Sequence, residues 1–201
     1  MESYKGSDLY PREYVVKYVA RVYDTLERAS NSFGNAFAVR FELNFPLDVD
    51  VSALDCGSII KTFINSLKSQ IKASCSKSNR GRNIDSTVRY IWCKELNRSH
   101  REHYHFLLIV NHYAYRTLGV LGSDKNNLSN RIQKAWSRAL SKALKSNDFK
   151  SNVHFSKNGS YKLKRGNKEQ FDLLFYRTAY LAKSDTKSHG NRKNIFQCSR
   201  L

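Results

Sequence analysis

Acidic residues, proline and cysteine are all scarce in this sequence of 201 residues. Asp and Glu together number 17 against 35 Lys and Arg, which leaves a formal net charge of +18. An excess of that size favours a polyanionic partner, with nucleic acid first and an acidic membrane surface second, against the plain alternative of a merely soluble basic protein. Only two prolines and a 40% share of hydrophobic residues are typical of a folded chain. We therefore expect one domain, residues 1–201, with a substantial core.

The four cysteines lie far apart and form no C-x-x-C pair, at Cys56, Cys75, Cys93 and Cys198. This spacing argues against a zinc finger or a disulfide framework and favours reduced thiols in a cytoplasm. No apolar run approaches the length of a membrane span, and the first residues lack the apolar core of a signal peptide. We therefore expect no membrane partner.

Hydrophobic periodicity predicts an α+β protein. Pro11 suits the first turn of the first helix, and Asn158-Gly159 predicts a tight hairpin turn between the last two strands. From the first strand onward, the order is β-α-β-β-α-β with an extra hairpin strand and a closing helix. This order matches the ferredoxin-like (split βαβ) arrangement, a central antiparallel sheet with flanking helices. Helices are expected over residues 11–30, 57–76, 126–145 and 167–183, strands over 37–45, 87–95, 103–110, 152–155 and 160–164, a loop over 74–83, an N-terminal helical extension over 1–34 and a basic tail over 184–201.

Two histidines one residue apart open the most apolar of these strands. Since side chains alternate along a strand, His103 and His105 must point to the same face. The apolar run 106–110 predicts a strand covered on both sides, near the middle of a sheet. If the preceding strand pairs with it so that Glu95 lies opposite His103, one carboxylate and two imidazoles converge, a set that can bind a metal ion with open positions left for a substrate. The plain alternative is a pair of hydrogen-bonded histidines at a strand entrance.

The first strand, residues 37–45, alternates strictly between an apolar side and a polar side. In the ferredoxin-like topology the first and third strands are central neighbours. The polar side of the first strand, Arg40, Glu42 and Asn44, is therefore expected beside the two histidines, with helices covering the other face.

The closing helix ends with two tyrosines and a lysine on one side, at Tyr176, Tyr180 and Lys183. A tyrosine can attack phosphorus and hold a covalent phosphodiester, and a nearby lysine can stabilise the charge. The spacing Y-x-x-K also begins at Tyr14 and Tyr161, so it does not identify the nucleophile by itself. We favour Tyr180, because it lies on a coherent polar face and follows the histidine strand, with Tyr176 and Tyr14 as alternatives.

Together, His103-Tyr104-His105 before aliphatic residues and the later Tyr180-Leu181-Ala182-Lys183 resemble a known pattern. They are similar to the HUH motif and Y-x-x-K signature of rolling-circle replication initiators and relaxases. More narrowly, residues 90–95, 103–111, 175–183 and 194–200 resemble the inovirus replication-protein family, also known from cryptic prophages as the YagK/YfjJ C-terminal domain. The resemblance covers about residues 35–200. Tyr104 is bulkier than the aliphatic residue common between the two histidines.

This resemblance implies an HUH-endonuclease type of fold and an enzyme that nicks and joins single-stranded DNA through a 5′-phosphotyrosyl intermediate. Such an enzyme starts replication of a phage, prophage, plasmid or genomic island in the cytoplasm of a bacterial host. His103 and His105 would bind Mg²⁺ or Mn²⁺, Tyr180 would be the nucleophile and Lys183 its assistant. Glu95 is inferred as the third ligand from the hairpin geometry and from the superfamily's habit of a carboxylate there. Tyr176 reproduces a two-tyrosine spacing seen in some initiators.

The expected partners are single-stranded or hairpin origin DNA and a host helicase or polymerase. Basic residues would follow the DNA backbone and an aromatic ring would stack on bases. Three other classes stay open: a non-catalytic DNA-binding regulator on the same fold, a non-haem iron oxygenase and an RNA-binding module. The residues expected to contact DNA are Arg40, Asn44, Arg80, Arg82, Tyr113, Arg192 and Lys193.

Overall fold

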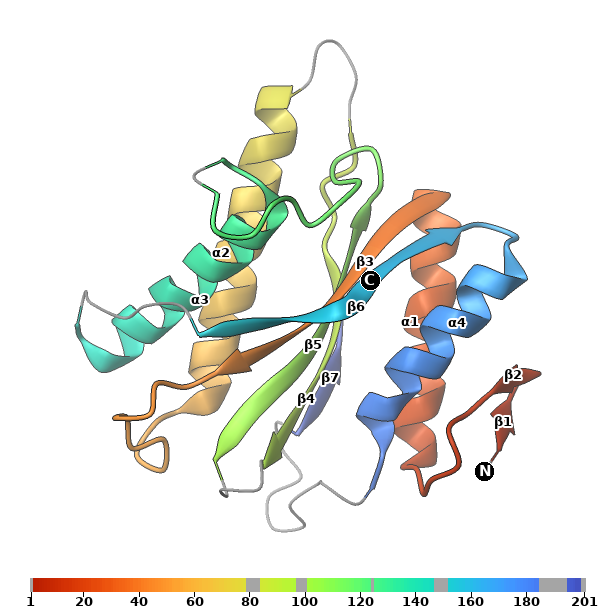
Figure 1. Ribbon diagram of the computed structural model, residues 1–201, viewed down its shortest axis with the longest axis horizontal. Coiled ribbons are helices and arrows are strands. Elements are labelled where there is room, and N and C mark those ends of the chain that lie inside the picture. Colours follow the sequence, from red (N-terminus) through yellow and green to blue (C-terminus); the bar gives the residue numbers. More distant parts are fainter. Residues whose placement is uncertain are drawn as a thin grey trace.

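The computed structural model describes residues 2–78, 84–96, 101–123, 125–146, 152–184 and 195–199. Its centre is a five-stranded sheet in the order β6-β3-β5-β4-β7, in which every neighbouring pair is antiparallel (Figure 1). The strands of this sheet are β3 (Asn35–Asn44), β4 (Arg89–Leu96), β5 (Glu102–Asn111), β6 (Val153–Lys164) and β7 (Phe196–Cys198). The other elements are β1 (Ser3–Tyr4), β2 (Ser7–Asp8), α1 (Val16–Phe33), α2 (Cys56–Ser78), α3 (Leu128–Leu144), α4 (Lys168–Ala179) and the 3₁₀ turn η1 (Tyr180–Ala182).

The path β3-α2-β4-β5-α3-β6 confirms the predicted ferredoxin-like topology. Its four strands lie in the spatial order fourth, first, third, second, so β3 and β5 are the central neighbours. The short strand β7 extends the sheet beside β4. Residues 196–198, predicted to belong to a tail, therefore form an edge strand, because Phe196 and Cys198 alternate inward and are buried.

Helices cover both faces of the sheet, as Figure 1 shows. On one face, α2 and α3 pack on the apolar side of β3, where Trp136 and Phe63 are fully buried. On the other face, α1 and α4 bury a second core against the sheet. The prediction that helices cover only the face opposite the histidines is incomplete, because Ala36 and Ala38 on β3 are small enough to let α1 and α4 approach.

The N-terminal segment differs from its prediction as a helix from residue 11. It begins with the hairpin β1–β2, whose two turn residues, Lys5 and Gly6, both have positive φ, at 50° and 77°. The helix α1 starts only at Val16, so Pro11 precedes it by five residues. The helix α2 in turn continues to Ser78, into the segment predicted as a loop.

The predicted hairpin turn at Asn158-Gly159 is wrong, because β6 runs continuously along β3 and bulges there. Phe155 and Ser160 oppose residues of β3 that are two apart, so residues 156–159 face a single residue, Arg40. A Cβ on Gly159 would lie 2.8 Å from the carbonyl oxygen of Arg40. Glycine thus serves a close approach of two backbones inside a bulged strand instead of a reversal of the chain.

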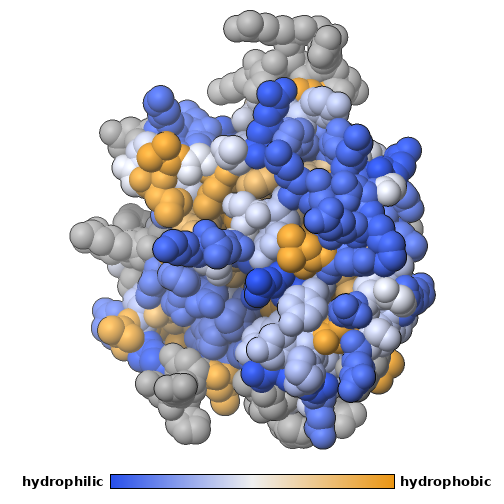
Figure 2. All heavy atoms as spheres, turned by 45° about the vertical axis from the view of Figure 1, so that its right-hand side comes forward, coloured by the Kyte–Doolittle hydropathy of each residue, from blue (hydrophilic) through white to orange (hydrophobic). Residues whose placement is uncertain are grey.

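Figure 2 shows the molecule turned so that the α1 and α4 side of Figure 1 comes forward. The coloured atoms of this face are mainly hydrophilic, and the hydrophobic ones form small separate groups. Among the described residues, no helix combines the length and the apolar character needed to cross a membrane. All four cysteines are free thiols.

Candidate active site

The register of the three central strands builds the site. Glu95 of β4 lies opposite His103 of β5, as the sequence predicts. On the other side of β5, Asn44 of β3 pairs with His103 and Glu42 pairs with His105. Because directly opposed residues of neighbouring strands project to the same face, the polar side of β3 and both histidines meet on the face that also carries α1 and α4.

Glu95, His103 and His105 bring three metal-binding atoms together, all within 4.8 Å of one another. The Nε2 atoms of the two histidines are 3.0 Å apart, and His105 Nε2 lies 3.4 Å from Glu95 Oε2. In the described part of the chain this is the one group of three or more such residues with that geometry. We name these three residues the triad.

A second carboxylate holds His105 from its other ring nitrogen. Glu42 Oε1 lies 3.3 Å from His105 Nδ1, and Glu42 Oε2 lies 3.6 Å from Nδ1 of His154 on β6. The hydrogen bond from His105 lowers the pKa of Glu42. Burial alone would lower the pKa of His105, but the hydrogen bonds and charges of Glu42 and Glu95 outweigh it and the pKa is raised. His105 is therefore oriented by carboxylates on both sides.

The other histidine of the triad has the opposite electrostatic setting. Burial, together with the charge of His105, lowers the pKa of His103. The neutral imidazole, which is the form that binds metals, is thereby favoured at His103.

Lys183 links the triad to Tyr180. Its ammonium lies 3.1 Å from Glu95 Oε2 and donates a hydrogen bond of 3.2 Å to the Tyr180 hydroxyl. The Lys183 side chain is only 7% exposed. Burial would lower the pKa of Lys183, but the charge of Glu95 and the bond to Tyr180 outweigh it and raise the pKa. The charged Lys183 therefore bridges the Tyr180 hydroxyl and the Glu95 carboxylate of the triad.

The chain reaches this arrangement by leaving the helix early, so the prediction of a helix to residue 183 is wrong. The helix α4 ends at Ala179, and Tyr180–Ala182 form a 3₁₀ turn. Lys183 then adopts an extended backbone (φ −58°, ψ 147°) and forms a bridge with Tyr14 of the N-terminal segment. This tighter winding turns Lys183 into the protein, whereas a continued α-helix would place it on the outer polar side.

The alternative nucleophiles lie in the same neighbourhood but have other partners. The Tyr176 ring packs against Tyr10, with centroids 5.8 Å apart. The Tyr14 hydroxyl donates to the carbonyl oxygen of Tyr10 at 2.9 Å, and burial is the main cause that raises the pKa of Tyr14. Of the three tyrosines, Tyr180 is the one that shares Lys183 with Glu95.

The predicted DNA-contacting residues fall into two groups. Asn44 stands opposite His103 at the site, half-buried Arg40 lies under the bulge of β6, and Tyr113 is 61% exposed beyond the end of β5. Arg80, Arg82, Arg192 and Lys193 lie outside the described residues.

Sequence reasoning placed Glu42 beside the histidines but gave it no role, and it missed His154 entirely. Alternation along β3 was a sufficient signal for the side of the sheet that Glu42 occupies. No local signal exists for His154, because its place depends on the pairing of β6 with β3 and on the bulge between them.

The model of the YagK/YfjJ C-terminal domain family matches residues 2–199. Two uncharacterized proteins of Escherichia coli (strain K12) are similar along nearly their whole lengths. YfjJ is 30% identical over 201 residues, which cover 93% of this chain and 95% of YfjJ. YagK is 28% identical over 212 residues, which cover 100% of this chain and 99% of YagK.

Among solved structures, the chain is similar to the N-terminal nuclease domain of non-structural protein 1 of minute virus of mice. The TM-score is 0.27 with 13% identity, covering 90% of this chain and 78% of that chain. That viral domain coordinates Zn²⁺ in its active-site pocket and recognises DNA at the origin of replication. With a score this low, the fold assignment depends on the strand order alone.

Proposed function

The chain belongs to the YagK/YfjJ C-terminal domain family, and we propose that it is a metal-dependent enzyme that cuts and rejoins single-stranded DNA. The observation that carries this proposal is the position of Lys183, which contacts both the Tyr180 hydroxyl and Glu95 of the triad. These contacts support the inference that a phenol and a candidate metal group act on one phosphate. The net charge of +18 suits a DNA substrate.

The residues of the triad fit a divalent cation. Two imidazole nitrogens 3.0 Å apart cannot both carry a proton without strong repulsion, so at least one of them offers a lone pair, and the carboxylate of Glu95 lies 3.4 Å from His105 Nε2. Glu42 accepts from Nδ1 of His105, which leaves Nε2 of His105 as the ligand atom. Of the two expected metals, the mixed nitrogen and oxygen donors favour Mn²⁺ over Mg²⁺, which prefers oxygen. When bound, the ion supplies Lewis acidity toward the phosphate under attack.

The residues of the chain supply the rest of the chemistry. The Tyr180 oxygen attacks phosphorus and forms a phosphotyrosyl bond, while the bond from phosphorus to the 3′ oxygen breaks. The phenol proton leaves to water, and the released 3′ oxygen takes a proton from water. The Lys183 ammonium stabilises the negative charge on the phenol oxygen, because it already donates to that atom. The reverse reaction rejoins the strand, and no nucleotide cofactor is needed because one phosphodiester replaces another.

This chemistry suits the initiation of rolling-circle replication. A free 3′-OH can prime a polymerase, and the protein stays attached to the 5′ end until the strand is rejoined. We propose an HUH-type enzyme like that of inoviruses, working on single-stranded or hairpin origin DNA of a phage, prophage, plasmid or genomic island in the bacterial cytoplasm. A host helicase and polymerase are the partners that such a cycle requires.

A covalent-adduct assay tests the proposal. The protein, stripped of metal with a chelator, is incubated with labelled single-stranded oligonucleotides of randomised sequence in EDTA, Mg²⁺ or Mn²⁺. A denaturing gel then detects protein bound covalently to DNA. We expect an adduct with metal that Tyr180→Phe abolishes while DNA affinity stays nearly unchanged. Tyr161→Phe is the matched control, because Tyr161 has the same Y-x-x-K spacing on β6 and should keep full adduct formation.

Two results would contradict the proposal in different ways. An undiminished adduct with Tyr180→Phe would assign the attack to another tyrosine, which Tyr176→Phe and Tyr14→Phe would then identify. DNA binding without any adduct in either Mg²⁺ or Mn²⁺ would support the alternative, a non-catalytic DNA-binding regulator on the same fold.

A further inference from the structure

The N-terminal segment brings a second cation to the proposed nucleophile. We propose that Arg12 is a further catalytic residue, whose guanidinium binds the phosphate that Tyr180 attacks. This inference rests on the proposed function of the site. Arg12 lies within residues 2–199, which the family model matches, but ahead of the histidine strand and of Tyr180.

Arg12 lies against the rings of two tyrosines. Its Cζ atom is 5.0 Å from the centroid of the Tyr180 ring and 5.7 Å from that of Tyr10. The two rings meet edge to face, with centroids 6.5 Å apart. A guanidinium within about 6 Å of an aromatic centroid is held by cation–π attraction. Tyr180 therefore holds the planar donor group of Arg12 next to its own ring.

The charge distribution around Tyr180 explains why a second cation matters. The ammonium of Lys183 is buried and contacts Glu95 at 3.1 Å and the Tyr180 hydroxyl at 3.2 Å. Tyr180 is half-buried, and Arg12 beside its ring is exposed. A guanidinium presents a fork of donors that matches two oxygens of a phosphate. Arg12 is thus placed to bind the incoming phosphate, while Lys183 serves the phenol oxygen.

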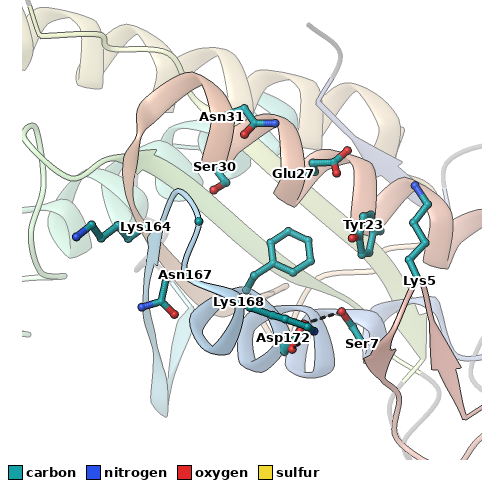
Figure 3. A pocket seen from close by; sticks show the side chains of 12 residues that line it. Lys5, Ser7, Tyr23, Glu27, Ser30, Asn31, Lys164, Asn167, Lys168 and Asp172 are labelled. Atoms are coloured by element: carbon teal, nitrogen blue, oxygen red, sulfur yellow. Dashed lines mark hydrogen bonds and ion pairs between the residues drawn. The ribbon is translucent and has the colours of Figure 1, made fainter.

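The segment that carries Arg12, residues 9–15, follows the β1–β2 hairpin, and this hairpin attaches the beginning of the segment to the fold. Figure 3 shows the pocket where this hairpin docks between α1 and α4. Ser7 donates a hydrogen bond of 2.6 Å to Asp172 of α4, drawn as the dashed line in Figure 3. The Lys5 ammonium lies 4.7 Å from the centroid of the Tyr23 ring on α1. Asp172 and Lys5 thus attach the hairpin to α4 and to α1.

The second end of the segment is bonded to the chain around Lys183. The Val15 amide donates to the Ala182 carbonyl oxygen at 2.9 Å, and the Ser184 amide donates to the Glu13 carbonyl oxygen at 3.1 Å. Arg12 stands directly before these bonds. Because both ends are attached, its position relative to Tyr180 is set before DNA arrives, which is the condition for effective electrostatic stabilisation of a transition state.

Single-turnover adduct formation with Mn²⁺ and single-stranded DNA tests the role of Arg12. The rate at saturating DNA is measured separately from the DNA concentration that gives half the maximal rate. Lys17→Ala is the matched control, because it removes one exposed positive charge at the start of α1, where the ammonium lies 5.5 Å from the Tyr18 ring. Arg12→Gln is measured beside Arg12→Ala, so that a folding defect in one variant, seen in thermal unfolding, leaves the other to decide.

We expect the saturating rate of Arg12→Ala and Arg12→Gln to fall about 10- to 100-fold relative to Lys17→Ala. Arg12→Lys should recover only part of the loss, because lysine lacks the fork of donors. A saturating rate within twofold of Lys17→Ala would overturn the inference, even if more DNA were needed, because a distant backbone contact would explain that. Absence of any adduct with the unaltered protein would instead refute the proposed function, and this inference with it.

Discussion

The buried ion pair between Lys183 and Glu95 should contribute measurably to the free energy of unfolding. The two side chains are 7% and 4% exposed, and their charged atoms are 3.1 Å apart. Lys183→Met keeps most of the volume but leaves the Glu95 carboxylate without its ammonium. Removing one partner of a buried ion pair costs about 3–5 kcal/mol. Since Glu95 keeps the Cys93 thiol at 3.4 Å and His105 at 3.4 Å, we expect a loss near the lower end, about 3 kcal/mol.

A divalent metal should reverse much of this loss. Oε2 of Glu95 faces both the Lys183 ammonium and Nε2 of His105, so an ion held by the triad would be repelled by that ammonium. In Lys183→Met the repulsion is gone, and the ion can take over the neutralisation of Glu95. At an effective dielectric constant of about 20, two unit charges about 4 Å apart interact by about 4 kcal/mol, and the Glu95 carboxylate, which faces both cations, offsets much of the larger repulsion from a divalent ion. We therefore expect saturating Mn²⁺ to stabilise the variant by on the order of 2–4 kcal/mol more than it stabilises the unaltered protein.

Urea unfolding in EDTA and in Mn²⁺, followed by circular dichroism, measures both effects. In a separate thermal unfolding experiment in EDTA, the same loss corresponds to a lowering of Tm by about 6–12 °C for a domain of this size. Lys134→Met, which removes an exposed charge from α3, should change stability by less than about 0.5 kcal/mol. A loss below about 1 kcal/mol for Lys183→Met, or an equal gain from Mn²⁺ in both proteins, would refute the shared role of Glu95.

Three further predictions address the surroundings of the site and the sheet. Glu42→Gln should weaken Mn²⁺ binding, measured by titration calorimetry, about 10- to 100-fold, because Glu42 orients His105; His154→Gln, which alters a 65% exposed side chain, should have little effect. Burial raises the pKa of the Cys198 thiol to about 11, because the thiolate is disfavoured in the folded protein. The contribution of the neutral thiol to the free energy of unfolding is therefore complete below the unfolded pKa near 9 and is lost as pH rises toward 11. Cys198→Ala should therefore lose about 2 kcal/mol less between pH 8 and pH 10.5 in urea unfolding. Gly159→Ala should cost about 1–3 kcal/mol in the same assay, because the added Cβ meets a backbone oxygen at 2.8 Å.

Alternation and parity were enough to predict the centre of the sheet. Side chains of a strand repeat every two residues, so His103 and His105 had to share a face. An antiparallel hairpin with Glu95 opposite His103 then brings all three to the same side. The order of helices and strands likewise pointed to the ferredoxin-like topology, because few arrangements satisfy that order.

Sequence patterns that are compatible with two different backbone structures were less informative. Asn158-Gly159 is compatible with a hairpin turn and with a bulge, and the pairing of β6 with β3 selects the bulge. Helical periodicity over residues 167–183 did not reveal that α4 ends at Ala179. Val15 is bonded to Ala182 at the end of η1 and Glu13 is bonded to Ser184 just after it, and these bonds hold the chain at Lys183 in an extended form.

The sequence by itself therefore determined the strand that carries the histidines, the face they share and the charge that suits a polyanion. Tertiary structure alone decided that Arg12 lies on the ring of Tyr180 and that His154 lies beside Glu42. Each of these pairs joins residues more than 100 positions apart. Local periodicity reports which side of its own element a residue occupies, whereas the neighbours of that side are set by the packing of the whole chain.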